Sequence, residues 1–190
     1  MLNVERDTEL ALVAGLHKGD GEAFDAIYAA HRARVFAYLF RMCRRRSLAE
    51  DLSQEVWIRL ARSARKLAPD TRLRPWLFTV ARNLMVTHTR WRAVDGQSID
   101  ALVFASRLSD VETPEQLAIA QQTGARLESA LAALPADQRE ALLLVTVEQL
   151  SPTDVAAILG VRPETLRQRL SRARQSLAQS LLPTVQRKSQ

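Results

Sequence analysis

The most informative stretch of the chain is residues 150–177, which read LSPTDVAAILGVRPETLRQRLSRARQSL. Ser151 can cap a helix with its hydroxyl, a proline follows at the first helical position, and Asp154 places an acid in the first turn. These signals predict a short helix over residues 152–159. Glycine takes the left-handed conformation at a helix end most readily, so Gly160 should terminate it.

A second helix should begin at Pro163 and reach about Leu182. Its apolar residues recur at helical spacing and form the expected buried stripe: Leu166, Leu170, Ala173 and Leu177. The opposite face carries Glu164, Gln168, Ser171, Arg172 and Gln175, with Arg167 and Arg174 on one flank and Arg169 on the other. Small and apolar residues before it would let the two helices cross closely: Val155, Ala156, Leu159 and Val161.

A short helix, a glycine turn and a basic helix make a candidate helix-turn-helix. Arginine, glutamine and serine side chains can hydrogen-bond to guanine and adenine edges in a major groove, while flanking arginines hold phosphates. A solvated basic helix in an ordinary bundle is the alternative. The helix cap, the Gly160 turn and the positive charge favour DNA binding.

The composition predicts an all-α protein. Among 190 residues there are 6 Gly and 7 Pro, and most segments are rich in good helix formers. Few windows alternate as strands do. The formal net charge of +6 suits a polyanionic partner, either nucleic acid or an acidic membrane surface.

The charge is divided unevenly along the chain. Basic residues dominate between positions 32 and 92 and between 162 and 174, whereas residues 95–115 hold five acids and one arginine. We therefore expect two small helical domains joined by an acidic, flexible linker. The expected boundaries are 1–93 for the first domain, 94–122 for the linker, 123–183 for the second domain and 184–190 for a tail.

Four helices are expected in the first domain, at Thr8–His17, Glu22–Cys43, Ser47–Leu67 and Pro75–Arg92. Ser47 and Glu50 stand in the relation of a capping box. The apolar spacing of the second helix is carried by Phe24, Ile27, Tyr28, Val35, Tyr38 and Leu39. In the second domain, a helix should start near Thr123 and another should span Asp137–Gln149.

The third helix has an apolar inward stripe and a polar outward one. The inward residues are Ala49, Leu52, Val56, Leu60, Ala64 and Leu67, with Trp57 at the edge, and the outward residues are Asp51, Gln54, Glu55, Ile58 and Arg62. Ile58 among exposed charges indicates a protein contact, although a single exposed aliphatic residue is also ordinary. No histidine, cysteine or further acid joins Asp51 and Glu55, which argues against a catalytic carboxylate pair.

The fourth helix is divided in a similar way. Leu77, Val80, Ala81, Leu84 and His88 lie on one side, and Thr79, Arg82, Asn83, Val86 and Arg90 lie on the other, with Trp76 and Trp91 near the two ends. Polar and basic groups beside aromatic rings can grip an unstacked single strand. Trp76 is nevertheless expected in the core.

Other classes of site find little support. Cys43 is the only cysteine, so no intrachain disulfide or zinc cluster is expected, and the residue should be a small buried hydrophobe. His31 and His88 are interpreted as structural. The first residues do not resemble a signal peptide, and no apolar run approaches the ~20 residues of a membrane span, which predicts a soluble cytoplasmic protein without membrane insertion.

Four segments resemble, in order, the conserved regions of the extracytoplasmic-function (ECF) sigma factors of bacterial RNA polymerase. Residues 19–24 (GDGEAF) fit the opening motif, and residues 49–60 (AEDLSQEVWIRL) resemble region 2.2. Residues 75–84 (PWLFTVARNL) resemble regions 2.3 and 2.4, and residues 150–177 resemble region 4.2. Together these segments represent nearly the whole chain outside the linker.

The resemblance implies a sigma-2 and a sigma-4 domain without an intervening sigma-3 domain, and it implies three binding surfaces. Core polymerase would be bound by Asp51, Gln54, Glu55 and Ile58, the −10 element by Arg82, Asn83, Val86 and Arg90, and the −35 element by Arg167, Gln168, Ser171 and Arg172. Asn83 would contact a flipped base, with the loop 67–74 as the pocket wall. The linker would run towards the polymerase active-site channel.

The partners implied by the resemblance are core RNA polymerase, through its β′ clamp helices and β flap, promoter DNA, and an anti-sigma factor, which is often membrane-anchored. No cofactor and no enzymatic activity are implied. Leu67 stands where relatives often have an aromatic residue, and Pro163 and Glu164 replace a small residue and a glycine. Both departures bear on the promoter sequence.

Two other functions are weighed against this one. An autonomous helix-turn-helix regulator would bind duplex DNA specifically without polymerase. A nucleic-acid-processing enzyme would need a metal or nucleophile constellation, which the sequence does not offer.

Overall fold

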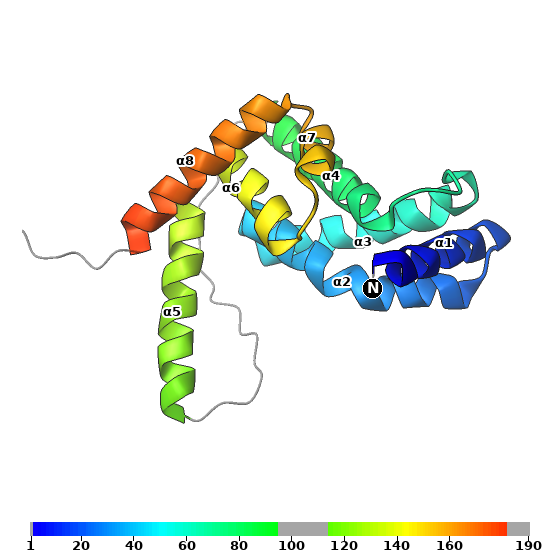
Figure 1. The fold of residues 1–190 in the computed structure, drawn as a ribbon, viewed down its shortest axis with the longest axis horizontal. Coiled ribbons are helices and arrows are strands. Elements are labelled where there is room, and N and C mark those ends of the chain that lie inside the picture. Colours follow the sequence, from blue (N-terminus) through cyan, green and yellow to red (C-terminus); the bar gives the residue numbers. More distant parts are fainter. Residues whose placement is uncertain (1, 95–113, 182–190) are drawn as a thin grey trace, which may run out of the picture. The chain divides into compact units, whose positions relative to one another are not determined.

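Figure 1 presents the fold, a computed structural model that describes residues 2–94 and 114–181, with side chains described from 6 to 89 and from 124 to 181. Every regular element in these ranges is a helix, which confirms the predicted all-α class. The chain divides into two compact units, Met1–Leu102 and Val103–Gln190. Most of the expected linker lies outside the described residues, so the domain boundaries drawn from the sequence stay a prediction.

The first unit contains α1 (Leu2–Lys18), α2 (Gly21–Cys43), α3 (Arg46–Ser63), the 3₁₀ turn η1 (Ala64–Lys66) and α4 (Leu73–Val94). Its core lies around α2, which contacts α1, α3 and α4. The rings of Tyr38 and Phe78 meet edge to face there, with their centroids 5.4 Å apart. The inward stripe predicted for the third helix is buried, and Trp57 is buried with it.

Helix ends in the first unit differ from those predicted. Helix α1 begins at Leu2 instead of Thr8, and α3 begins at Arg46, so Ser47 lies inside the first turn and cannot act as its cap. The predicted capping box is therefore wrong, and Glu50 instead accepts from the Arg46 Nε at 2.8 Å. Helix α4 begins two residues before Pro75. Proline is tolerated at this position because it lacks only an N–H, and the first four N–H groups of a helix have no acceptor within the helix.

Two burial predictions also need correction. Trp76 is partly exposed and lies in the first turn of α4, next to the loop. Cys43 is half-buried at the end of α2, where its thiol donates to the Arg45 carbonyl oxygen at 3.3 Å. Burial raises the pKa of this thiol, and backbone hydrogen bonding at Arg45 and at Cys43 itself opposes that shift.

The second unit contains α5 (Pro114–Ala133), α6 (Ala136–Leu142), the π turn η2 (Leu143–Val147), α7 (Pro152–Leu159) and α8 (Pro163–Leu181). Helix α5 begins nine residues before the predicted Thr123. The helix predicted over 137–149 changes to π geometry at Leu143, where the Glu148 N–H donates to the Leu143 carbonyl at 2.9 Å. Gln149 then has a positive φ of 51° and ends the segment.

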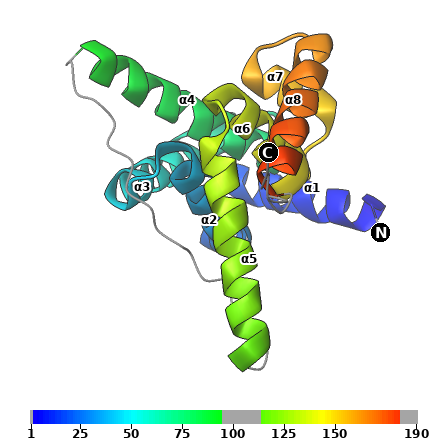
Figure 2. The ribbon, with the colours of Figure 1, turned by 90° about the vertical axis from the view of Figure 1, so that its left-hand side faces the viewer.

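Helices α7 and α8 lie side by side in both views (Figures 1 and 2). The Ser151 hydroxyl accepts from the Asp154 N–H at 3.1 Å and donates to the Asp154 carboxylate at 2.6 Å. Gly160 has a φ of 64°, and the following Val161 N–H donates to the Ala156 carbonyl at 3.0 Å. Both predicted ends of the short helix are confirmed.

Candidate nucleic-acid and protein interfaces

Helix α8 separates buried from exposed side chains as its periodicity predicts. Leu166, Leu170 and Ala173 are buried, and the helix contacts α5, α6 and α7. The residues assigned to the −35 element are all exposed on the other side: Arg167, Gln168, Ser171 and Arg172. Leu177, predicted to be buried, is only partly covered.

Ion pairs sort the arginines of α8 into different roles. Arg169 is mostly buried and its Nε lies 3.2 Å from the Asp137 carboxylate of α6, so it fastens two helices instead of flanking DNA. Arg167 pairs with Glu164 at 2.9 Å, and both side chains are more than half exposed. Arg172 makes no ion pair within the described part of the chain. Its guanidinium is therefore available to a ligand.

Helix α4 presents part of its predicted polar face. Asn83 is exposed, Arg82 and Val86 are half-buried, and the side chain of Arg90 lies outside the described residues. The Thr79 hydroxyl donates to the Pro75 carbonyl at 2.7 Å, so it offers an approaching strand only its acceptor lone pairs. Among the residues predicted for the polar face of α4, Asn83 is thus the most exposed side chain that can both donate and accept hydrogen bonds.

The loop before α4 runs from Leu67 to Arg72. Leu67 and Leu73 are buried and fix its two ends, whereas Ala68, Pro69 and Asp70 are exposed. A turn closes its middle, where the Thr71 N–H donates to the Ala68 carbonyl at 2.9 Å. The exposed backbone between the buried Leu67 and Leu73 is therefore suited to form one wall of a base-binding pocket.

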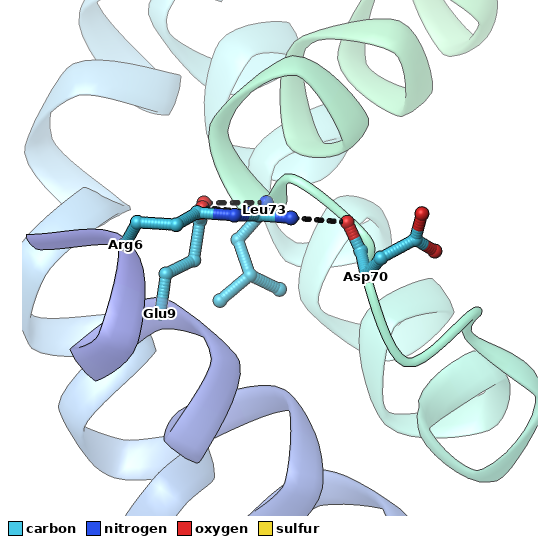
Figure 3. Close-up of polar contacts among 4 residues, drawn as sticks. All are labelled: Arg6, Glu9, Asp70 and Leu73. Carbon is cyan, nitrogen blue, oxygen red and sulfur yellow. Dashed lines mark hydrogen bonds and ion pairs between the residues drawn. The ribbon is translucent and has the colours of Figure 1, made fainter. Parts of the chain in front are cut away.

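Helix α1 contacts this loop through side chains that the sequence did not single out. Arg6 donates to the Asp70 carbonyl at 2.6 Å, and Glu9 accepts from the Leu73 N–H at 2.7 Å (Figure 3). His17 Nε2 lies 2.7 Å from the Leu67 carbonyl, which can only accept, so this nitrogen carries the proton. No local pattern predicts such contacts, because the partners are 50 to 64 residues apart.

Helices α2 and α3 enclose an open groove of about 790 Å³ on the outward side of α3. Gln54 and Ile58 line it, and Ile58 remains 36% exposed. Tyr28 of α2 lines the groove too and is 38% exposed, although its spacing had suggested a core position. It packs edge to face on Trp57, with centroids 5.0 Å apart. An exposed aromatic and aliphatic groove is typical of a protein-binding surface.

The acids of this surface remain accessible. Asp51 is exposed, and Glu55 is half-exposed and accepts from the Arg59 Nε at 3.0 Å on the same helix. Across the groove, the Arg32 guanidinium lies 5.8 Å from the centroid of the Tyr28 ring. Asp51 and Glu55 do not line the groove, whose lining contains one acid, Glu50, and one base, Arg32. The groove therefore combines apolar side chains with charges of both signs.

Within residues 6–89 and 124–181, no group of three His, Cys, Asp or Glu side chains could hold a metal ion. Of the helices in the described part of the chain, none has the length and apolar character needed to cross a membrane. These findings add no site to the three surfaces above.

The fold defines a two-unit helical protein with a helix-turn-helix in its second unit. Residues 27–93 match the family model "Sigma-70 region 2" and residues 124–177 match "Sigma-70, region 4". The chain is 35% identical to the RNA polymerase sigma factor CarQ of Myxococcus xanthus, over 86% of this chain and 91% of that protein. It is 29% identical to the RNA polymerase sigma-H factor of Pseudomonas aeruginosa, over 97% and 98% of the two chains.

Among solved structures, the chain is similar to the sigma factor RpoE in complex with the anti-sigma factor NepR from Bartonella quintana. The TM-score is 0.69 at 26% identity, over 83% of this chain and 96% of that one. The chain therefore belongs to the extracytoplasmic-function group of the sigma-70 family.

Proposed function

We propose that this chain binds core RNA polymerase and directs promoter-specific initiation of transcription through the three surfaces described above. Its activity is that of a transcription initiation factor without covalent chemistry of its own. The observation that supports the proposal is the agreement of two family matches, in the expected order, with two units of which the first exposes Asn83 and the second exposes the residues predicted for the −35 element. Because the proposed partners, RNA polymerase and promoter DNA, are cytoplasmic in bacteria, we propose that the protein acts in the cytoplasm.

Helix α8 is proposed to read the −35 element in the major groove. Arg172 and Gln168 lie one turn apart on its exposed face, where a guanidinium can pair with guanine and an amide with adenine. Arg167 and Ser171 complete the surface. Glu164 holds Arg167 in the free protein, and we expect this pair to open when Arg167 meets a phosphate or a base.

Helix α4 and the loop 67–72 are proposed to open the −10 element and hold one base out of the stack. Asn83 can donate to and accept from the edge of that base, and Arg82, Val86 and Arg90 would line the strand. The side chain of Leu67 is buried, so the loop offers its backbone and short side chains where relatives often have an aromatic ring. The base preference should therefore differ from that of such relatives.

The outward face of α3 and the adjoining α2–α3 groove are proposed to dock on the β′ clamp helices of core polymerase. The face contributes Asp51 and Glu55, and the groove contributes Gln54 and Ile58. Tyr28 and Trp57 supply an apolar floor that a partner can desolvate. An anti-sigma factor that covers this groove, or the sigma-4 surface, would keep the protein inactive. The β flap is the expected polymerase partner of the second unit.

Run-off transcription with sigma-free core polymerase on a library of promoter-length DNA tests the proposal. We expect initiation that depends on this protein, lost by about one to two orders of magnitude in Arg172→Ala and Asn83→Ala. Ile58→Asp should abolish core binding, and Ala61→Asp, in the lining of the same groove, should weaken it as well. Specific binding to duplex DNA without any response to core polymerase would instead identify an autonomous regulator.

A further inference from the structure

The loop 67–72 takes its shape from α1, a helix that the proposed function does not use. Figure 3 shows Arg6 and Glu9 extending from α1 to the loop and to the start of α4. Arg6 contacts the Asp70 backbone, while the Asp70 carboxylate points away from it. With His17 on the Leu67 carbonyl, α1 holds the first residue of the loop, its middle and the residue after it.

Glu9 supplies a cap to α4 from a distant part of the chain. Its Oε1 accepts from the Leu73 N–H at 2.7 Å, and Leu73 is the first residue of α4. The first N–H groups of a helix have no acceptor within it and carry the positive end of the helix dipole. A carboxylate in this place satisfies one donor and stabilises the end charge, so it fixes where α4 begins.

Arg6 connects that cap to the exposed part of the loop. Its Nη1 lies 2.7 Å from Glu9 Oε2, and its Nη2 donates to the Asp70 carbonyl at 2.6 Å. The two side chains are 33% and 22% exposed, so solvent screens their interaction only partly. One guanidinium thus orients the carboxylate and restrains the loop at the same time.

We propose that Arg6 and Glu9 are positioning residues for the −10 strand: they order the loop 67–72 in the shape that receives the flipped base. Neither side chain needs to touch DNA for this role. The proposal rests on the proposed function of the loop, and it adds α1 to the parts of the chain that set promoter opening. We call the contacts of Arg6 and Glu9 with Asp70 and Leu73 the clasp. Without the clasp, binding of the strand must also order the loop, and this entropic cost weakens binding.

The test combines a measurement on the loop with one on DNA, both on the full chain. Amide hydrogen exchange at Leu73, followed by NMR, reports the clasp in the absence of polymerase. The holoenzyme's dissociation constant for single-stranded −10 DNA, taken from a promoter selected in the run-off library, reports the strand. Variants are Glu9→Ala, Arg6→Ala and the milder Glu9→Gln, which keeps an acceptor for Leu73 but loses the charge.

Asp7→Asn is the matched control, because Asp7 is exposed on the same helix and has no polar contact in the described part of the chain. We expect Glu9→Ala to raise Leu73 exchange and the −10 dissociation constant about tenfold each, as the loss of one charge-assisted hydrogen bond requires. Glu9→Gln should have a smaller effect. Core affinity and the Asp7→Asn variant should match the unaltered protein.

Faster exchange without any loss of −10 affinity would overturn the positioning role, and so would unchanged exchange at Leu73. Equal losses of core affinity and −10 affinity would also overturn it, because they would indicate general damage to the unit. If the unaltered holoenzyme bound no −10 strand while Glu9→Ala still freed Leu73, the proposed function would fail although the clasp exists.

Discussion

The two DNA surfaces proposed for this chain are built in opposite ways. The face of α8 consists of exposed side chains on one helix. The cap and the glycine turn of the preceding α7, and the buried stripe of α8 itself, are all encoded within residues 150–177. The loop before α4 depends on Arg6, Glu9 and His17, which lie 50 to 64 residues away. The proposed −35 surface is thus determined by local sequence signals, whereas the shape of the loop before α4 is determined by tertiary contacts.

This difference has a consequence for how the surfaces tolerate change. Substitutions on the exposed face of α8 should remove a proposed contact with DNA and leave the helix intact, because the buried stripe holds it in place. Substitutions in α1 should remove no proposed contact with DNA, but they should alter the loop that is proposed to receive the −10 strand. Effects on the −10 element should therefore arise from a wider set of positions than effects on the −35 element.

The largest effects on stability should come from truncating a buried leucine in the core of one unit or the other. Leu166 and Leu73 are both 1% exposed, the first on α8 and the second at the start of α4. Each substitution to alanine should destabilise its own unit by about 2–5 kcal/mol. All three tryptophans, at positions 57, 76 and 91, belong to the first unit, so their fluorescence reports that unit alone.

Urea unfolding followed by tryptophan fluorescence and by circular dichroism separates the two cases. Leu166→Ala should leave the fluorescence transition in place and shift part of the helical signal to lower urea. Leu73→Ala should shift the fluorescence transition itself. A fluorescence transition that moved equally in both variants would contradict the independence of the units.

A smaller effect is expected at two serines that look alike in sequence. Both were predicted to cap helices, but Ser151 caps α7 and Ser47 lies inside α3. Ser151→Ala should destabilise the second unit by about 1 kcal/mol, and Ser47→Ala should leave the first unit nearly unchanged. Circular dichroism in urea measures the former and tryptophan fluorescence the latter. A loss at Ser47 as large as that at Ser151 would be inconsistent with this placement of the cap.

These serines explain why one part of the fold could be predicted and another could not. At Ser151, the cap, the proline and the acid all agree with Gly160 eight residues after Pro152, so each signal supports the others. At Ser47 the capping box was the sole signal for the start of the helix, without a proline or a glycine to support it. The helix begins one residue earlier, and Glu50 pairs with Arg46. The family resemblance gave the order of the elements there, but not their ends.

The functional surfaces show the same division. The outward positions of α3 and α8 follow from helical periodicity, and the structure exposes Gln54, Ile58 and Arg172 as predicted. Periodicity alone could not distinguish the exposed Tyr28 from a core aromatic, because the groove forms only when α2 and α3 pack. Nor could it assign Arg169 to Asp137, since that ion pair joins two helices far apart in sequence.

The smallest effect should be a pH dependence in the first unit, at His31 of α2. Burial lowers the pKa of this imidazole from its usual value, the charges of Arg74 and Arg34 act in the same direction, and Glu9 opposes them. The unfolded chain therefore binds a proton at a higher pH than the folded one. Stability from the neutral ring is present above about pH 6.5 and is lost as the pH falls below that value.

His31→Asn should flatten this slope between about pH 5 and 7, by an amount on the order of a few tenths of a kcal/mol after allowance for solvent screening. Urea midpoints read by tryptophan fluorescence measure the change. Glu9→Gln should act in the opposite sense: without the carboxylate, the pKa of His31 falls further and the slope becomes steeper. NMR titration of the His31 ring in the unaltered protein and in Glu9→Gln checks this directly, and an unchanged ring pKa in Glu9→Gln would show that the charge of Glu9 does not act on His31.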